Sequence, residues 1–453
     1  MTFTRQGKRG GFKDTRPEEI LSGILRAVYT KVNLDPALIE DINVGNVLPP
    51  GGGAAAARMA ALHAGIPIST SIATVNRQCS SGLTAVNQIA TQIIAGQIDV
   101  GIGKYRRAFS WRFSSDLSDT GAGVESMTFG YGPASMPDGW SETVLSNQDA
   151  EDCLLPMGIT SENVATDYGI TRAQQDAFAA KSFQKAAAAA KAGRFRDEIV
   201  PLKVNWVDPT TEQVKEIVVV ADDGVRDGVT AESLSKLKPA FRKDGTTHAG
   251  NASQVSDGAA AVLLVRRSVA KRLGLPVVGK FVAASVAGVP PRVMGIGPAF
   301  AIPKVLGQTG LTADEVDFFE INEAFASQAV YCIEKLGLSY EKVNLHGGAI
   351  AIGHPLGMSE FFLRLMRGTH ISSLNSRCTP GCHRSEHREA DKQANICDEY
   401  VHRHRHGDGC CVRERALSTL KMMVLYFGGC HNNIFTLKHS QCNVRVRLYL
   451  DHR

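Results

Sequence analysis

One cysteine in the first half of the sequence lies in a setting that favours nucleophilic chemistry. Cys79 follows an apolar run and stands within Asn-Arg-Gln-Cys-Ser-Ser-Gly-Leu, residues 76–83, before small residues that predict a helix. This position places the sulfur at a helix N-terminus, where backbone N–H groups and the helix dipole favour thiolate over thiol. An isolated cysteine is more often a buried structural residue. The case for a nucleophile therefore depends on the rest of the chain.

Four further motifs follow in order along the sequence. They are Met-Gly-Ile-Thr-Ser-Glu-Asn-Val-Ala at 157–165, the segment 248–259 that begins His-Ala-Gly-Asn, Glu-Ile-Asn-Glu-Ala-Phe-Ala at 320–326, and residues 346–357, which end Gly-His-Pro-Leu-Gly. Together with the segment around Cys79, they resemble the motifs of degradative thiolases of the 3-ketoacyl-CoA type, especially the peroxisomal ones. The resemblance runs from about Gly10 to Gly357, apart from residues 104–120.

The resemblance implies three catalytic residues. The Cys79 thiolate attacks the keto carbon of a β-ketoacyl thioester, a step that needs a base and hydrogen-bond donors for the oxyanion and the enolate. His354 takes the proton from Cys79. Asn322 holds a water that, with His354, stabilises the enolate of the departing acetyl-CoA. A lone histidine before proline is often a turn residue and a lone asparagine a loop amide, but their joint occurrence with Cys79 favours catalysis.

The resemblance also implies contacts to coenzyme A, which is a substrate here. Ser253 is expected along the pantetheine arm, Met157 and Phe325 along its tunnel, and Arg226 near the nucleotide end. Their ordinary alternatives are a capping serine, core apolar residues and a solvated arginine. No metal or redox cofactor is expected, because the sulfur and coenzyme A carry the chemistry.

The implied activity is the cleavage of a 3-ketoacyl-CoA by coenzyme A, as in fatty acid β-oxidation. The alternative within the family is acetoacetyl-CoA thiolase, which differs mainly in acyl length. Ketoacyl synthases also use a cysteine but lack the Asn-Glu-Ala-Phe element at 322–325. The resemblance further implies a homodimer formed through the first half, and a peroxisomal location, with cytoplasm and mitochondrion as alternatives.

Composition is that of an ordinary globular protein. The chain has 453 residues, 43% hydrophobic and 21% charged, with a formal charge of +5. That small excess does not indicate a nucleic-acid partner, and no run approaches the roughly 18 apolar residues that a membrane span needs. The basic, glycine-rich start, residues 1–13, has no apolar segment and is not a secretory signal. The start is expected to be clipped, since the family has a strand and an Arg-Thr segment before Gly10-Gly11-Phe12.

The predicted fold class is α/β: the thiolase fold, with two similar α/β halves, buried mixed sheets in αβαβα layers and an inserted loop domain. Alternating helix and strand patterns in 15–103 and the return of strand signals from Ala259, including 277–289, support this. The expected divisions are a first half at 1–268, with a loop domain at about 122–250 and an aberrant insert at 104–120, an incomplete second half at 275–357, and a non-family tail at 358–453.

The tail differs in composition from the rest. Of the 10 cysteines, only Cys79, Cys153 and Cys332 precede residue 358. The family's second catalytic cysteine, in a Cys-Ile-Gly-Thr-Gly-like loop, is absent. Back-translated and shifted by one base, residues 398–411 can spell such a loop, and residues 377–384 can spell another family segment. We therefore hypothesise two retained introns, at 104–120 and after Gly357, the second of which shifts the frame and leaves this chain inactive or unstable.

A different class of function takes the tail at face value. Cys378, Cys382, His383 and His387 have spacings that a zinc site could use, and the Arg/His run at 402–406 could contact nucleic acid. The chain would then be a non-catalytic, thiolase-like binding protein. The spacing fits no established finger pattern, and a solvated basic tail is the usual outcome for such a sequence.

Overall fold

In the computed structural model the described residues are 2–5, 10–99, 118–130, 139–358, 421–425 and 434–438. The strands are β1 (Thr2–Arg5), β2 (Ile39–Gly45), β3 (Ser71–Val75), β4 (Ser118–Ser126), β5 (Leu202–Val207), β6 (Val214–Val219), β7 (Ser256–Leu264), β8 (Phe318–Ile321), β9 (Lys421–Leu425) and β10 (Ile434–Lys438). The α-helices are α1 (Pro17–Thr30), α2 (Ala54–His63), α3 (Ser81–Ile94), α4 (Met127–Gly130), α5 (Glu142–Leu145), α6 (Gln148–Asp152), α7 (Met157–Tyr168), α8 (Arg172–Lys191), α9 (Ala231–Ser235), α10 (Arg267–Arg272), α11 (Gly297–Thr309), α12 (Ala326–Lys335) and α13 (Ala349–Ile352). Short 3₁₀ turns include η2 (Pro50–Gly53), η4 (Pro291–Ile296), η5 (Tyr340–Lys342) and η6 (Leu356–Met358).

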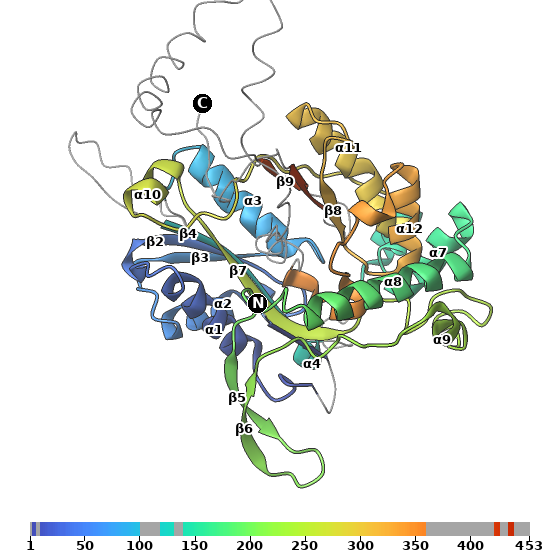
Figure 1. Cartoon of the computed structure of the whole chain (residues 1–453), viewed down its shortest axis with the longest axis horizontal. Coiled ribbons are helices and arrows are strands. Elements are labelled where there is room, and N and C mark those ends of the chain that lie inside the picture. The colour runs from blue at the N-terminus through green and yellow to red at the C-terminus, as the bar shows by residue number, and fades with distance from the viewer. Residues whose placement is uncertain are drawn as a thin grey trace, which may run out of the picture.

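The larger sheet has five strands in the order β1-β7-β4-β2-β3 (Figure 1). β2 pairs in parallel with β3 and β4, whereas β7 runs antiparallel to β4 and β1. The sheet is therefore mixed, as predicted. Strand β7 reads as a nearly unbroken run of small and apolar residues and is buried on both faces, which is typical of a strand covered by helices on each side.

The helices and sheets form alternating layers. Apolar residues of α1 and α2 pack against one face of the larger sheet, in one buried cluster with β2 and β4. Helix α3 packs on the opposite face, where Leu83 and Ile89 share a cluster with Phe318 of β8. Beyond β8, helices α11 and α12 bury their apolar sides in a third cluster. α3 therefore lies between the two sheets (Figure 1).

The boundaries around β4 differ from those expected. β4 begins at Ser118, inside the predicted 104–120 insert, and ends at Ser126, inside the predicted loop domain. Its residues pair with both β2 and β7, so the backbone ladder assigns them to the larger sheet. Residues 104–117 lie outside the described part. The chain between β4 and β7 holds helices α4–α9 and the β5–β6 hairpin.

The second half also departs from expectation. The smaller sheet has the order β8-β10-β9, so two short segments of the tail pair beside β8. The prediction of a strand over 277–289 is wrong, because the structure has no helix or strand between α10 and η4. A strand exists only where a neighbour completes its hydrogen-bond ladder. The described residues contain no strand paired with this segment, although Val277 and Phe281 are buried.

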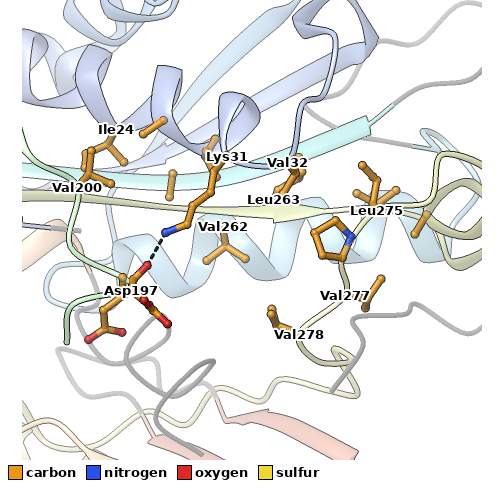
Figure 2. A pocket seen from close by; sticks show the side chains of 17 residues that line it. Ile24, Lys31, Val32, Asp197, Val200, Val262, Leu263, Leu275, Val277 and Val278 are labelled. Carbon is orange, nitrogen blue, oxygen red and sulfur yellow. Dashed lines mark hydrogen bonds between the residues drawn. The ribbon is translucent and has the colours of Figure 1, made fainter. Parts of the chain in front are cut away.

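A cavity of about 170 Å³ lies beneath α1, at the edge of β7. Figure 2 shows its apolar lining, from Ile24 and Val32 to Leu263 and Val277, and the Lys31 ammonium that donates to the backbone carbonyl of Asp197. None of the residues predicted for catalysis or coenzyme A binding lines it. Among the described residues, no helix is both long and apolar enough to cross a bilayer.

Candidate active site

The turn that carries Cys79 connects β3 to α3. Gln78 has a left-handed backbone with φ of 51°, and its N–H donates to Asn76 Oδ1 over 2.9 Å. The N–H of Arg77 donates to Ser81 Oγ, also over 2.9 Å. These bonds fold the chain back on itself just before α3, whose first residue is Ser81. Cys79 thus lies at the helix N-terminus, as predicted, and is only 7% exposed.

His354 and Asn322 come together from separate segments of the second half. Asn322 follows β8, and its amide nitrogen lies 3.4 Å from His354 Nε2. The backbone N–H of His354 donates to the Gln254 carbonyl at 3.0 Å and to Ser256 Oγ at 3.2 Å. Both side chains are buried. The structure therefore brings together two of the three predicted catalytic residues in direct contact.

The electrostatics of this pair suit a base. Burial lowers the pKa of His354 to about 4, so the imidazole is neutral near pH 7 and can accept a proton. The Asn322 Oδ1 atom is buried, and no described residue hydrogen-bonds to it. A buried amide oxygen without a protein partner is a natural acceptor for a water or a substrate group.

A close backbone contact joins the His354 segment to the first turn of α3. A Cβ added to Gly82 would lie 3.0 Å from the Gly357 carbonyl oxygen, and a Cβ on Gly357 would lie 2.4 Å from Asn46 Cα. Only glycine permits so close an approach. Because Gly82 is the second residue of α3 and Gly357 follows His354 by three residues, this contact places the candidate base on the same side of the larger sheet as Cys79.

One of the residues predicted for coenzyme A, Phe325, packs against an aromatic side chain that sequence reasoning missed, Phe241. Phe241 lies with its ring centroid 6.4 Å from that of Phe325, edge to face, and packs over Gly158, the neighbour of Met157. The Ser253 N–H donates to the Ala324 carbonyl at 2.9 Å. Phe241 and Met157 remain 42% and 40% exposed. The only signal in the sequence was an aromatic residue isolated in the polar stretch 238–246.

Arg226 is exposed on the loop before α9. Gln254 ties that loop to the catalytic segment: its Nε2 donates to the Gly224 carbonyl at 3.0 Å and to Ala351, in α13, at 2.9 Å. The loop thus lies beside the helix that leads into His354. Arg226 therefore lies on an exposed loop that is hydrogen-bonded, at Gly224, to the segment before His354.

We expect Phe241→Ala to weaken coenzyme A binding. Loss of an exposed ring that also packs on Phe325 should raise the dissociation constant about fivefold, with a small change in melting temperature because the ring is half in solvent. Isothermal titration calorimetry with coenzyme A measures this. Phe300→Ala, which removes a 49% exposed ring from α11, is the matched control. Equal affinities for both variants would contradict a role for Phe241.

The other two described cysteines, Cys153 and Cys332, have their thiols against backbone carbonyls. Cys153 is exposed, and its Sγ donates to the Asp149 carbonyl at 3.3 Å. Cys332 is buried in α12, with its Sγ 3.7 Å from the Gly295 carbonyl, and burial raises the pKa of its thiol well above the usual range. Neither of these two contacts involves Asn322 or His354.

The described residues contain no group of three or more His, Cys, Asp or Glu side chains that could hold a metal ion. The tail residues considered for zinc, Cys378, Cys382, His383 and His387, lie outside the described part, as does the Arg/His run at 402–406. The zinc hypothesis stays a prediction that metal analysis of the purified protein would test.

Two family models match the chain. One, described as the N-terminal domain of thiolase, matches residues 1–104 and 120–268, and the other, the thiolase C-terminal domain, matches residues 275–377. The chain belongs to the thiolase family. The matches leave out residues 105–119, inside the predicted insert, and extend 20 residues past the predicted end of the second half.

Curated relatives agree with these matches. The chain is 54% identical over 356 residues to "3-ketoacyl-CoA thiolase, peroxisomal" of Yarrowia lipolytica. The matched residues cover 79% of this chain and 81% of the relative. It is 54% identical over 349 residues to "3-ketoacyl-CoA thiolase B, peroxisomal" of Rattus norvegicus, with 77% of each chain covered.

Solved structures show the same fold. The dimeric peroxisomal thiolase of Saccharomyces cerevisiae is 41% identical, with a TM-score of 0.70 over 97% of this chain and 96% of that one. A second structure, of the peroxisomal 3-ketoacyl-CoA thiolase of the same yeast, is described as five-layered α-β-α-β-α with two core domains of identical topology. It is 38% identical, with a TM-score of 0.64 over 96% of this chain and 95% of that one. The predicted thiolase fold is confirmed.

Proposed function

We propose that this chain is a 3-ketoacyl-CoA thiolase that forms an acyl intermediate on Cys79. The contact between Asn322 and His354, next to the turn that packs on the start of α3, carries the proposal. The two relatives described above bear this activity in their names at 54% identity. A Bacillus anthracis acetyl-CoA acetyltransferase of known structure is 30% identical, so the acetoacetyl-CoA alternative has less support.

In the proposed reaction, neutral His354 takes the proton of the Cys79 thiol, and the thiolate attacks the keto carbon of the substrate. The resulting alkoxide collapses, the bond between the α-carbon and the keto carbon breaks, and its electron pair leaves on acetyl-CoA as an enolate. Asn322, through a water, and His354 stabilise that enolate. The enolate must then gain a proton at carbon, and a second coenzyme A thiol attacks acyl-Cys79 to release the shortened acyl-CoA.

The coenzyme A chain would run past Ser253, Phe325 and Met157 toward Arg226. Phe241, packed on Phe325, belongs to the same wall. The chemistry needs only the cysteine sulfur and coenzyme A, so the proposal requires no metal or redox cofactor.

We also propose that the protein is a homodimer located in the peroxisome. The similar yeast thiolase is described as dimeric, and the relatives as peroxisomal. β3 is the outer strand of the larger sheet, and Ile68 and Met59 beside it are 83% and 57% exposed. An open strand edge flanked by exposed apolar side chains fits a second copy. Light scattering after size exclusion and immunolocalisation of the endogenous protein test the two statements.

Acetylation of Cys79 tests the enzymatic proposal. When the full chain is mixed with acetyl-CoA, the Cys79 thiolate should attack the thioester and release coenzyme A, which takes up the proton held by His354. Peptide mapping by mass spectrometry should then find one acetyl group on the peptide that contains Cys79. An acetyl group found on other cysteines alone would reject Cys79 as the nucleophile.

A further inference from the structure

One face of β4 is built to admit other backbone segments and ends in a buried acid. Gly121 and Gly123 leave room on that face: a Cβ on Gly121 would lie 2.9 Å from the Val86 side chain of α3, and one on Gly123 would lie 2.9 Å from the Gly357 carbonyl oxygen. Because side chains alternate along a strand, the next residue on this face is Glu125. Its side chain is 0% exposed.

The Glu125 carboxylate accepts three backbone hydrogen bonds. Oε2 accepts from Val47 at 2.9 Å and from Gly357 at 3.0 Å, and Oε1 accepts from Leu48 at 3.2 Å. Two donors therefore belong to the segment after β2 in the first half, and one to the turn after His354 in the second half.

Both of these segments lie against the beginning of α3. A Cβ on Gly45, the last residue of β2, would lie 2.2 Å from the Gly82 nitrogen. The Gly357 carbonyl oxygen also lies close to Gly82, 3.0 Å from where a Cβ on Gly82 would be. Glu125 thus bridges two pieces of backbone that enclose the helix turn beside Cys79.

We propose that Glu125 is a positioning residue for acyl transfer: its carboxylate holds the turn after His354 against the start of α3 and so fixes the base relative to Cys79. The inference rests on the proposed role of Cys79. No substrate contact is assigned to Glu125. An acceptor-only carboxylate suits this site, because three N–H donors converge on it and a neutral acid or an amide turns one of its acceptor positions into a donor.

Ionisation controls this contact. Burial raises the pKa of Glu125 to about 7, against the three N–H donors that lower it, and the neighbouring Asp257 carboxylate of β7 raises it further. The groups that contact the carboxylate from residues 47–48 and Gly357 are uncharged backbone, and His354 is neutral above about pH 5 because its pKa is about 4. The positioning contact therefore strengthens as pH rises through about 7 and weakens as pH falls below it.

Ionisation of Glu125 strengthens the local contact but lowers the stability of the whole fold. An unfolded glutamate has a pKa of about 4.3, below the folded value of about 7. A raised folded pKa contributes stability that is fully present below the unfolded pKa and is lost as pH rises through the folded one. Ionised Glu125 thus weakens the fold while it strengthens the local contact, which is expected of a residue kept for positioning.

The test measures how fast iodoacetamide alkylates Cys79 in the full chain, by peptide mapping, at pH 6 and pH 8. In Glu125→Gln the amide leaves one backbone donor without an acceptor, so the rate at pH 8 should fall about tenfold. At pH 6, where the parent carboxyl is largely protonated, the ratio of parent to variant should approach one. The melting temperature of Glu125→Gln should equal or exceed that of the parent at pH 8.

Asp41→Asn is the matched control. Asp41 is also a buried carboxylate of the larger sheet with a raised pKa, about 6, but it bonds to Ser71 at the far end of β2. Its alkylation ratio should be near one at both pH values. Equal slowing in both variants, or a parent-like rate for Glu125→Gln at pH 8, overturns the proposal.

A second measurement needs no variant and no Cys79 reactivity. Hydrogen–deuterium exchange of the peptide around Gly357 in the parent, corrected for the intrinsic rate, should show protection at pH 8 that falls by several fold at pH 6. Unchanged protection overturns the positioning role even if Glu125→Gln does not fold. An unreactive Cys79 with pH-dependent protection would instead reject the proposed function and leave the bridge intact.

Discussion

Cys79→Ala is expected to accept no acetyl group from acetyl-CoA. The acyl intermediate is bonded covalently to this sulfur. Removal of the nucleophile typically lowers the reaction rate far more than removal of a supporting residue does. The rate of acetyl transfer should fall by at least about a thousandfold. Mass spectrometry of the intact chain and of its peptides, over a time course with acetyl-CoA, measures the loss.

Two comparisons make this result specific. Cys79 is 7% exposed, so alanine removes a small buried group and should leave a cooperative melting transition. Cys153→Ala changes an exposed thiol on the loop side and should keep the parent rate. Acetyl transfer that survives in Cys79→Ala but disappears in Cys153→Ala would contradict the assignment of the nucleophile.

The places in the fold of the residues proposed for catalysis could be predicted because each lies in a short local motif. Cys79 was predictable as a helix N-terminal residue, since an apolar strand and a small-residue helix flank it and fix its place in one βα turn. Asn322 and His354 were predictable from the resemblance. Their contact across 32 residues depends on β8 and α13 packing in the same cluster, which no local pattern encodes.

The residues that support the site were not predictable. Glu125 reads in the sequence as a polar residue within a glycine-rich segment, and its three backbone donors come from positions 77, 78 and 232 residues away. Phe241 reads as an isolated aromatic in a polar loop, and only the folded chain shows its ring against Phe325. Such contacts depend on tertiary packing rather than on periodicity.

The fold was predicted better in the first half than in the second. β2 and β7 are buried strands whose apolar runs require a covered sheet, and the layers followed from that. Residues 277–289 have the same apolar character, but no strand of the described residues pairs with them. Conversely, β9 and β10 are short apolar runs in a tail that was predicted to lie outside the family fold, and β10 pairs with both β8 and β9. Pairing partners, which apolar runs do not specify, decided both cases.

Steady-state thiolysis by this chain should be at least about a hundredfold slower than that of its Yarrowia lipolytica relative. We expect this slow turnover even though acetyl-CoA should still acetylate Cys79. Proton transfer by a positioned acid or base typically contributes 10²–10⁴-fold, and the enolate of acetyl-CoA needs such a group at its carbon. The family resemblance assigns that step to a second cysteine. Of the described thiols, Cys153 and Cys332 contact other parts of the backbone.

Deuterium exchange separates this missing step from the step that remains. In heavy water a complete thiolase should exchange the methyl protons of acetyl-CoA, since the acid–base group removes and returns them. This chain should transfer the acetyl group to Cys79 without exchanging those protons, which proton NMR of the recovered acetyl-CoA detects. Exchange that depends on Cys79 and is as fast as in the relative would mean that the tail supplies a working acid–base group. The proposed reading-frame shift would then be wrong as an account of the tail.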